Sequence, residues 1–177
     1  MKKQNFCQWI GVIVIFCMVH APVHAEIIGT WLFEEGKGNE VIDISGRNHA
    51  GALMGGAKWG KGKFGGGIEF DKTGFIEWKH HADFNFKESL TIMIYARIDN
   101  ITPQEWVELP RKETEYTMAA HKLGDKMEMT FWINIGGGWI GQIPAAGQFP
   151  AVKFGEWHHY ATTYDGKEVV LYLDGKN

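Results

Sequence analysis

The sequence predicts an all-β domain built as a sandwich or a barrel, and three observations support this. Period-two alternation and short runs of β-branched or aromatic residues predict strands near residues 27–33, 49–54, 67–71, 74–78, 89–98, 116–122, 128–135, 157–164 and 168–173. Clusters rich in glycine and aspartate, at 35–39, 60–63, 71–74, 136–138 and 165–167, supply turns between them. No window keeps a helical period, and the longest candidate, 104–115, contains Pro110. Many short strands joined by tight turns are typical of sandwiches and barrels.

Two of these strands have distinct faces. The aliphatic sides, predicted to form the core, consist of Leu90, Ile92, Ile94, Ala96 and Ile98 in one strand and Met129, Phe131, Ile133 and Ile135 in the other. The opposite sides carry Tyr95 and Arg97 in the first strand, and Trp132 and Asn134 in the second. A mixed polar and aromatic side is typical of a ligand-binding sheet face. It is also typical of an ordinary half-exposed sheet, which is the commoner case.

The N-terminus has the layout of a secretory signal peptide over residues 1–25. Lys2 and Lys3 precede an apolar run at 10–19, and Val23-His24-Ala25 offers a cleavage site after Ala25. The run is much shorter than the roughly 20 residues that a membrane-spanning helix needs. We therefore expect an exported domain, 26–177, that is secreted to an extracellular or periplasmic compartment and has no membrane span after cleavage.

The composition of residues 26–177 limits the classes of partner. Both cysteines, Cys7 and Cys17, leave with the signal peptide, so the domain has no disulfide. Removing Lys2 and Lys3 from 18 basic residues leaves 16 against 21 acidic residues, a net charge of −5. A mildly acidic domain without a basic run is not expected to bind nucleic acid.

An ordered series of short motifs carries a family resemblance. The motifs are WLFEEG at 31–36, DISGRNH at 43–49, GGGIEFD at 65–71, LTI at 90–92, AHK at 120–122, EWHHYATTYDG at 156–166 and LYLDG at 171–175. Over most of residues 27–175 the chain resembles a laminin-G-like jelly-roll domain of the concanavalin A-like lectin/glucanase superfamily. The resemblance implies a two-sheet antiparallel jelly-roll sandwich with one concave outer face. It also implies export and ligand recognition, often as one module of a larger extracellular protein.

Two features depart from the family pattern. Residues 101–115 form a longer, acidic connection that contains Trp106. The sequence stops at Asn177, just after a hairpin turn, whereas the resemblance implies at least one further strand that pairs near the first. We therefore expect a jelly roll that lacks its last strand or strands, and favour a fragment of a longer gene product.

The glucanases of the same superfamily require a test for catalysis. They resemble one another in a Glu-x-Asp-x-(x)-Glu strand that presents its carboxylates on one face. The nearest match is Glu69-Phe70-Asp71, which lacks the third carboxylate, and Lys72-Thr73-Gly74 turns the chain. We interpret Asp71 as a turn residue and expect no enzyme, with an unusual glycoside hydrolase as the minority alternative.

Two groups of residues have the side chains of metal ligands. Asp43, Ser45 and Asn48 could supply oxygen ligands to calcium from one loop, but an Asx turn at Asp43 is the favoured alternative. The adjacent pairs His80-His81 and His158-His159 cannot chelate one ion as pairs, because neighbours on a strand point to opposite faces.

Aromatic residues in predicted loops complete the candidate site. Trp139 follows a glycine triplet and Trp106 lies in the acidic connection, where each could form a platform for a ligand or a lid on the sheet edge. Trp31, Trp78 and Trp157 are predicted to be core residues. The first hypothesis is a non-catalytic, carbohydrate-binding module that uses Tyr95, Arg97, Trp132, Asn134, Trp139 and Trp106. The second is a protein-interaction or adhesion module that uses the same surface or the segment around Trp106.

Overall fold

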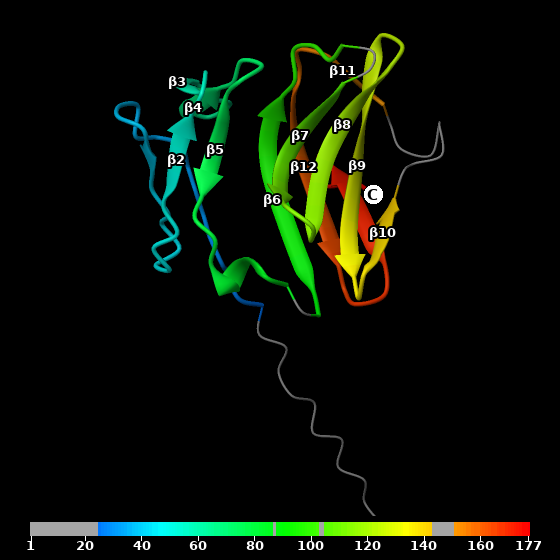
Figure 1. The fold of residues 1–177 in the computed structure, drawn as a ribbon. Helices are drawn as coiled ribbons and strands as arrows, with labels where there is room; N and C mark the ends of the chain where they lie inside the picture. The colour runs from blue at the N-terminus through cyan, green and yellow to red at the C-terminus, as the bar shows by residue number, and fades with distance from the viewer. Residues whose placement is uncertain (1–24, 87, 103–104, 143–150) are drawn as a thin grey trace, which may run out of the picture.

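The computed structural model describes residues 25–86, 88–102, 105–142 and 151–177, with the backbone alone at 140–142 (Figure 1). The described residues form strands and one short 3₁₀ helix, η1 (Ala82–Phe84). The strands are β1 (Glu40–Val41), β2 (Gly51–Met54), β3 (Lys58–Lys61), β4 (Gly66–Glu69), β5 (Phe75–Trp78), β6 (Leu90–Arg97), β7 (Trp106–Lys112), β8 (Tyr116–Leu123), β9 (Lys126–Ile135), β10 (Gly138–Gln142), β11 (Val152–Lys153), β12 (Trp157–Tyr164) and β13 (Val169–Leu173). All the pairings between them are antiparallel, so the all-β prediction is confirmed.

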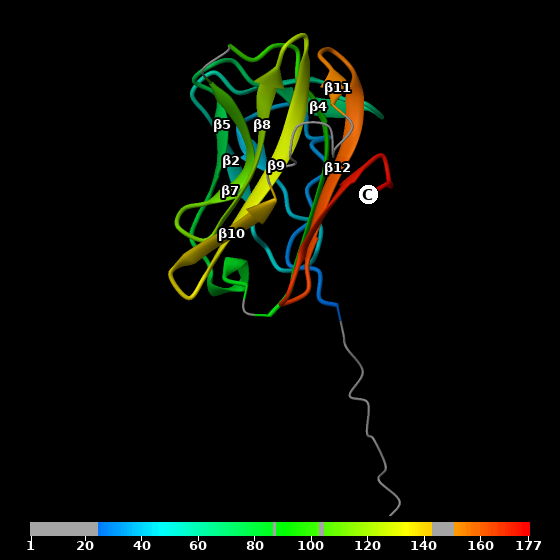
Figure 2. The ribbon, with the colours of Figure 1, turned by 90° about the vertical axis from the view of Figure 1, so that its right-hand side faces the viewer.

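Two sheets enclose the main core. One has the order β10-β9-β8-β7, with β11 also paired to β9, and the other has the order β13-β12-β6. Figures 1 and 2 show them as two layers, with β8 and β9 in one and β12 in the other. The buried cluster joins both layers, through Met118, Phe131 and Ile133 on one side and Tyr160 and Leu171 on the other. The predicted core sides of segments 89–98 and 128–135 are confirmed. Each large apolar side chain buried here contributes roughly 1.5–3 kcal/mol.

The N-terminal part forms smaller sheets beside β6, with the order β1-β2-β5 and the hairpin β3-β4. The strand predicted at 27–33 is wrong, because residues 25–39 form no strand. Phe33 has a positive φ of 59°, which interrupts an extended backbone. Side-chain contacts hold this segment instead: the Trp31 indole N–H donates to the His49 carbonyl at 2.8 Å, and its ring lies 5.1 Å from that of Trp78.

The acidic connection predicted at 101–115 is largely a strand, β7, which pairs with β8. The register shifts between Glu108 and Arg111, at the position of Pro110. A proline is tolerated at such an irregularity because no ladder hydrogen bond needs its missing N–H. Because of its acidic composition and its proline, this segment was predicted as a connection, whereas it is a strand at one edge of the larger sheet.

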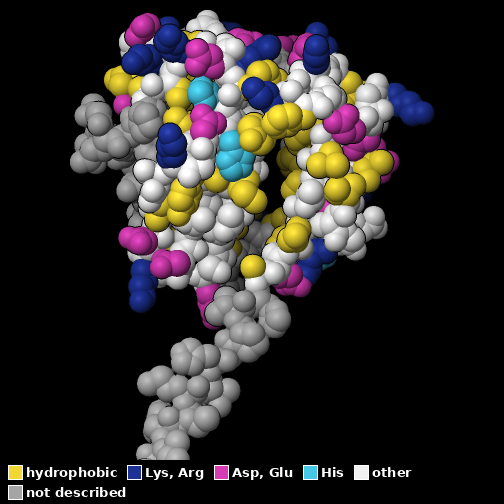
Figure 3. All heavy atoms as spheres, turned by 180° about the vertical axis from the view of Figure 1, so that it is seen from behind, with side chains coloured by type: hydrophobic (Ala, Val, Ile, Leu, Met, Phe, Trp, Pro, Cys, Tyr) yellow, Lys and Arg dark blue, Asp and Glu magenta, His cyan; other side chains and the backbone are white. Residues whose placement is uncertain are grey.

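A narrow opening separates the N-terminal part from the rest of the molecule when it is viewed from behind, and hydrophobic side chains border it (Figure 3). Several large apolar side chains of the described residues are exposed, among them Leu32, Ile44, Phe64, Met93 and Tyr95. Within the described part of the chain, no helix has the length and apolarity to cross a membrane.

Candidate functional site

The outer face of the β10-β9-β8-β7 sheet brings together most of the predicted ligand-binding residues. The register pairs Trp139 with Asn134, Trp132 with Thr117, and Trp106 with His121. Because directly paired residues share a face and the neighbouring residues of β9 point into the core, these side chains lie on the side away from the core. The outer face, as named here, consists of Trp106, Glu108, Arg111, Thr117, Ala119, His121, Glu128, Thr130, Trp132, Asn134 and Trp139.

Trp106 and Trp139 lie on strands rather than on loops, which corrects the prediction for both. Trp106 begins β7, and Trp139 is the second residue of β10. Gly136 and Gly137, with φ of 61° and 90°, make the turn that returns the chain beside β9. The two tryptophans are 51% and 50% exposed. Each therefore offers an aromatic surface fixed to a sheet.

One end of the outer face holds a buried carboxylate. Glu128 is 3% exposed, and its Oε2 lies 3.6 Å from Nε2 of His121. The Trp106 ring packs on the His121 ring at a centroid distance of 4.7 Å. Glu128 was missed by the sequence analysis, although it alternates with Thr130 and Trp132 along β9 and so falls on the same face.

The other end of the outer face holds an ion-paired arginine and a pocket. Nη1 of Arg111 donates to both carboxylate oxygens of Glu108, at 2.8 and 2.6 Å, and Nη2 donates to Glu113. These hydrogen bonds, first from Glu108 and then from Glu113, raise the pKa of Arg111. A pocket of about 260 Å³ is lined by Glu108, Arg111, Thr117 and Trp139, among others. Its volume is just below the ~300–1,000 Å³ of typical small-molecule sites.

Several polar atoms of the outer face are buried without a hydrogen-bond partner among the described residues. They are Thr117 Oγ1, His121 Nδ1, Glu128 Oε1 and Asn134 Oδ1. Buried polar groups are nearly always paired, so unpaired ones indicate a position where a ligand or solvent completes the bonding. Donors, acceptors and indole rings are thus combined on one face.

Tyr95 and Arg97 lie elsewhere, on the outer side of the β13-β12-β6 sheet. Tyr95 pairs with His159, and its ring contacts the rings of His159 at 4.9 Å and Phe64 at 5.0 Å. The Arg97 guanidinium lies 5.6 Å from the centre of the Trp157 ring. Trp157 was predicted to be core, but its pairing with Arg97 places it on this outer side. The predicted site residues are therefore divided between two sheets on opposite sides of the core.

The loop predicted as a calcium site is held by hydrogen bonds to Asp43. Its Oδ1 accepts from the N–H groups of Thr30 and Ser45, both at 2.9 Å. Its Oδ2 accepts from the Ser45 hydroxyl at 2.8 Å and the His49 N–H at 3.0 Å. Burial alone would raise the pKa of Asp43, but these hydrogen bonds outweigh it and hold the pKa well below its ordinary value. Asp43, Ser45 and Asn48 do not fit calcium in this arrangement, because donors surround both carboxylate oxygens. The Ser45 N–H bond to Oδ1 is that of the Asx turn, the alternative favoured from the sequence, so we expect no calcium at this loop.

The interpretation of Asp71 as a turn residue is confirmed. Its Oδ1 accepts hydrogen bonds from the N–H and the hydroxyl of Thr73, both at 2.8 Å. Glu69 is ion-paired with Lys58 at 3.3 Å across the β3-β4 hairpin. These two carboxylates therefore have structural partners.

The comparisons with known proteins agree on the fold. A family model described as the concanavalin A-like lectin/glucanases superfamily matches residues 70–177, which confirms the resemblance found in the sequence. A solved structure, the binding domain of Paraclostridial Mosquitocidal Protein 1, is similar with a TM-score of 0.64 and 15% sequence identity. The match covers 84% of this chain and 38% of that one, and at this identity the likeness concerns the fold. No curated protein matches the chain.

Proposed function

Because the chain belongs to the concanavalin A-like lectin/glucanases superfamily, we propose that it is an exported, non-catalytic recognition module whose outer face binds carbohydrate. The proposal includes a two-sheet jelly-roll sandwich as its fold. One observation carries it: Trp106, Trp132 and Trp139, from three different strands, lie on the same sheet face. Four buried polar atoms there, of Thr117, His121, Glu128 and Asn134, have no hydrogen-bond partner among the described residues.

The chemistry of this face suits a sugar. A pyranose ring has apolar C–H faces that pack on an indole, and hydroxyl groups at its rim that both donate and accept hydrogen bonds. Trp139 borders the pocket that also contains the Arg111–Glu108 pair, so stacking and hydrogen bonding are available at one place. Asn134, paired with Trp139, adds an amide oxygen that has no protein partner among the described residues.

The carboxylates of the outer face support binding rather than hydrolysis. Glycoside hydrolysis generally needs two carboxyl groups that flank the scissile bond, about 5–10 Å apart. Both carboxylate oxygens of Glu108 accept hydrogen bonds from Arg111, and Glu128 is buried beside His121, so neither carboxylate is free to act on a glycosidic bond. The solved structure with a similar fold is named as a binding domain, which agrees with a binding role.

A glycan array with the purified chain tests the proposal, with Trp139→Ala as the site variant and Tyr95→Ala as its matched control. Both residues are about half exposed aromatics on a sheet, but they lie on opposite sides of the core. Trp139→Ala should weaken the binding of any glycan hit at least tenfold, and Tyr95→Ala should leave it unchanged. The reverse pattern would place the site on the β6 side, and no hit on a broad array would count against carbohydrate as the ligand.

The outer side of the β13-β12-β6 sheet, on the β6 strand, together with the adjoining Phe64, supports a second candidate function, a protein-interaction module. Phe64, Met93 and Tyr95 are 75%, 66% and 47% exposed, and the Phe64 and Tyr95 rings are in contact. Exposed apolar clusters are typical of protein interaction sites. Met93→Asp should abolish capture of a protein partner while leaving glycan binding intact, which separates the two functions.

A further inference from the structure

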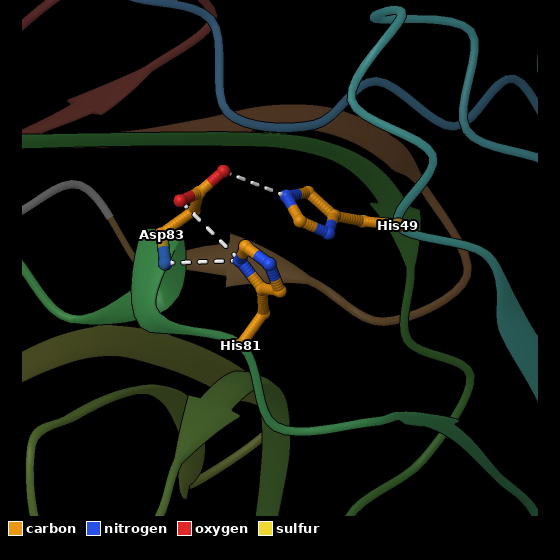
Figure 4. A group of neighbouring side chains, drawn as sticks. All are labelled: His49, His81 and Asp83. Carbon is orange, nitrogen blue, oxygen red and sulfur yellow. Dashed lines mark hydrogen bonds and ion pairs between the residues drawn. The ribbon is translucent and has the colours of Figure 1, made fainter.

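Two histidines and an aspartate meet beneath the N-terminal loop, away from the outer face (Figure 4). His49 ends the loop held by Asp43, just before β2, whereas His81 and Asp83 lie at the start of η1, after β5. His49 Nε2 lies 3.1 Å from Asp83 Oδ2, and His81 Nδ1 lies 3.3 Å from Asp83 Oδ1. The three potential ligand atoms lie within 4.8 Å of one another.

We propose that His49, His81 and Asp83 bind one zinc ion through His49 Nε2, His81 Nδ1 and a carboxylate oxygen of Asp83. Tetrahedral zinc has metal–ligand distances of about 2.0–2.2 Å, which place neighbouring ligand atoms roughly 3.3–3.5 Å apart. Both His–Asp distances are already close to this spacing. Closure of the remaining separation, at most 4.8 Å, needs a shift of little more than 1 Å. Two imidazoles and one carboxylate suit zinc, and hard cations such as calcium prefer oxygen ligands.

The hydrogen bonding of His81 also favours a cation here. The Asp83 N–H donates to His81 Nδ1 at 3.2 Å, so this nitrogen is unprotonated, and a metal ion would take the lone pair that the N–H engages in this structure. The same nitrogen faces Asp83 Oδ1 at 3.3 Å, which is also an acceptor. Two acceptors this close repel each other unless a positive charge lies between them. A metal ion between the two atoms would supply that charge.

The surroundings hold the ligands in place. His49 is 8% exposed, its N–H is bound by Asp43, and its ring packs on Phe84 at 4.8 Å. Arg47 donates to Asp83 Oδ2 at 2.8 Å, and this hydrogen bond, followed by that of His49, lowers the pKa of Asp83. Arg47 thus orients the carboxylate and leaves Oδ1 toward His81. The His81 side chain is 53% exposed, so the site is open to solvent for entry of the ion and for a fourth ligand.

Isothermal titration of the purified, metal-free chain with zinc chloride tests this site, with His81→Gln as the site variant. The neighbouring exposed His80, which is outside the cluster, gives a matched control, His80→Gln. We expect one zinc ion per chain, at least tenfold weaker binding in His81→Gln, and unchanged binding in His80→Gln. Cobalt, as a spectroscopic substitute, should give the intense visible bands of a tetrahedral site in the His80 variant but not in the His81 variant.

Competition by protons gives a second readout. Zinc binds neutral imidazole, so its affinity should fall between pH 7.5 and pH 5.5. Equal loss in the two histidine variants, or absence of binding at pH 7.5 in the unaltered chain, would overturn the proposal. Because His81 is exposed, its replacement should leave the far-UV circular dichroism spectrum unchanged, which separates loss of zinc from loss of the fold.

Discussion

Asp43→Asn should destabilise the N-terminal part more than its position in a loop suggests. The Asp43 carboxylate accepts four hydrogen bonds, from the N–H groups of Thr30, Ser45 and His49 and from the Ser45 hydroxyl. It thereby fixes the segment before β1 to the loop before β2. Asparagine keeps one acceptor oxygen, but it places an NH₂ group opposite the donors that face Oδ2.

The expected magnitude follows from these contacts. A hydrogen bond to a charged group contributes about 1.5–3 kcal/mol, and Asp43→Asn loses two of them and weakens the other two. Partial exposure of Asp43 reduces the effect, so we expect a loss of about 2–4 kcal/mol in the free energy of unfolding at pH 7. That is a large part of the ~5–15 kcal/mol of a typical domain.

The effect should also depend on pH. The folded-state pKa of Asp43 lies below the ordinary value of 3.8, so the carboxylate stabilises the fold fully above that pH and loses this contribution as the pH falls through the folded-state value. The difference between the unaltered chain and Asp43→Asn should therefore be constant from about pH 7 to 5 and shrink below 3.8.

Urea unfolding, followed by tryptophan fluorescence at several pH values, measures this difference, since Trp31 and Trp78 lie in the same part. Asp165→Asn is the control: one oxygen of Asp165 accepts both of its backbone hydrogen bonds, from Lys167 and Glu168, and asparagine retains such an oxygen. It should cause a much smaller change. Equal effects of the two substitutions, or an Asp43 effect that persists unchanged at pH 2, would refute the reasoning.

Three further predictions concern binding, processing and calcium. Trp132→Ala should weaken glycan binding by about 1–3 kcal/mol if the protein stays folded by near-UV circular dichroism, and unchanged affinity would exclude Trp132 as a central contact. N-terminal sequencing of the exported protein should begin at Glu26, and retention of Met1 would contradict the predicted cleavage. Millimolar calcium should leave the midpoint of thermal unfolding unchanged, because donors surround both oxygens of Asp43. A rise that Asp43→Asn abolishes would instead establish the calcium site.

Strands that alternate strictly could be predicted from the sequence. In 89–98 and 128–135 the inward residues differ sharply from the outward ones, and one buried face fixes the assignment. The segment at 27–33 is equally apolar and aromatic, but tertiary contacts decide its conformation: the Trp31 indole binds the His49 carbonyl, and Phe33 adopts a positive φ. Strand β7 was not predicted because Pro110 and several acidic residues are unusual in strands. The proline is tolerated there because the register shifts at its position.

The residues of the candidate site were partly predictable, but their separation onto two different sheets was not. Trp132 and Asn134 follow from alternation along β9, and Glu128 follows from the same pattern two residues before Thr130. Tyr95 and Arg97 show the same kind of outward pattern, yet their strand pairs with β12 instead of β8. The order of strands within a sheet depends on long-range pairing, which local alternation does not report.

The zinc site and the Asp43 loop should be energetically coupled, because His49 belongs to both. Its N–H is bound by Asp43 at 3.0 Å, and its Nε2 lies 3.1 Å from Asp83. Asp43→Asn frees the backbone of His49, so zinc binding must then order this residue, and the entropy lost in doing so reduces the observed binding free energy. We expect zinc affinity to fall several-fold in Asp43→Asn, and zinc to raise the unfolding midpoint of the unaltered chain. Asp165→Asn, far from the cluster in sequence, should change neither the zinc affinity nor the rise in unfolding midpoint that zinc causes. If Asp43→Asn lowers stability but leaves zinc affinity unchanged, His49 is positioned by its ring contact with Phe84 and not by Asp43.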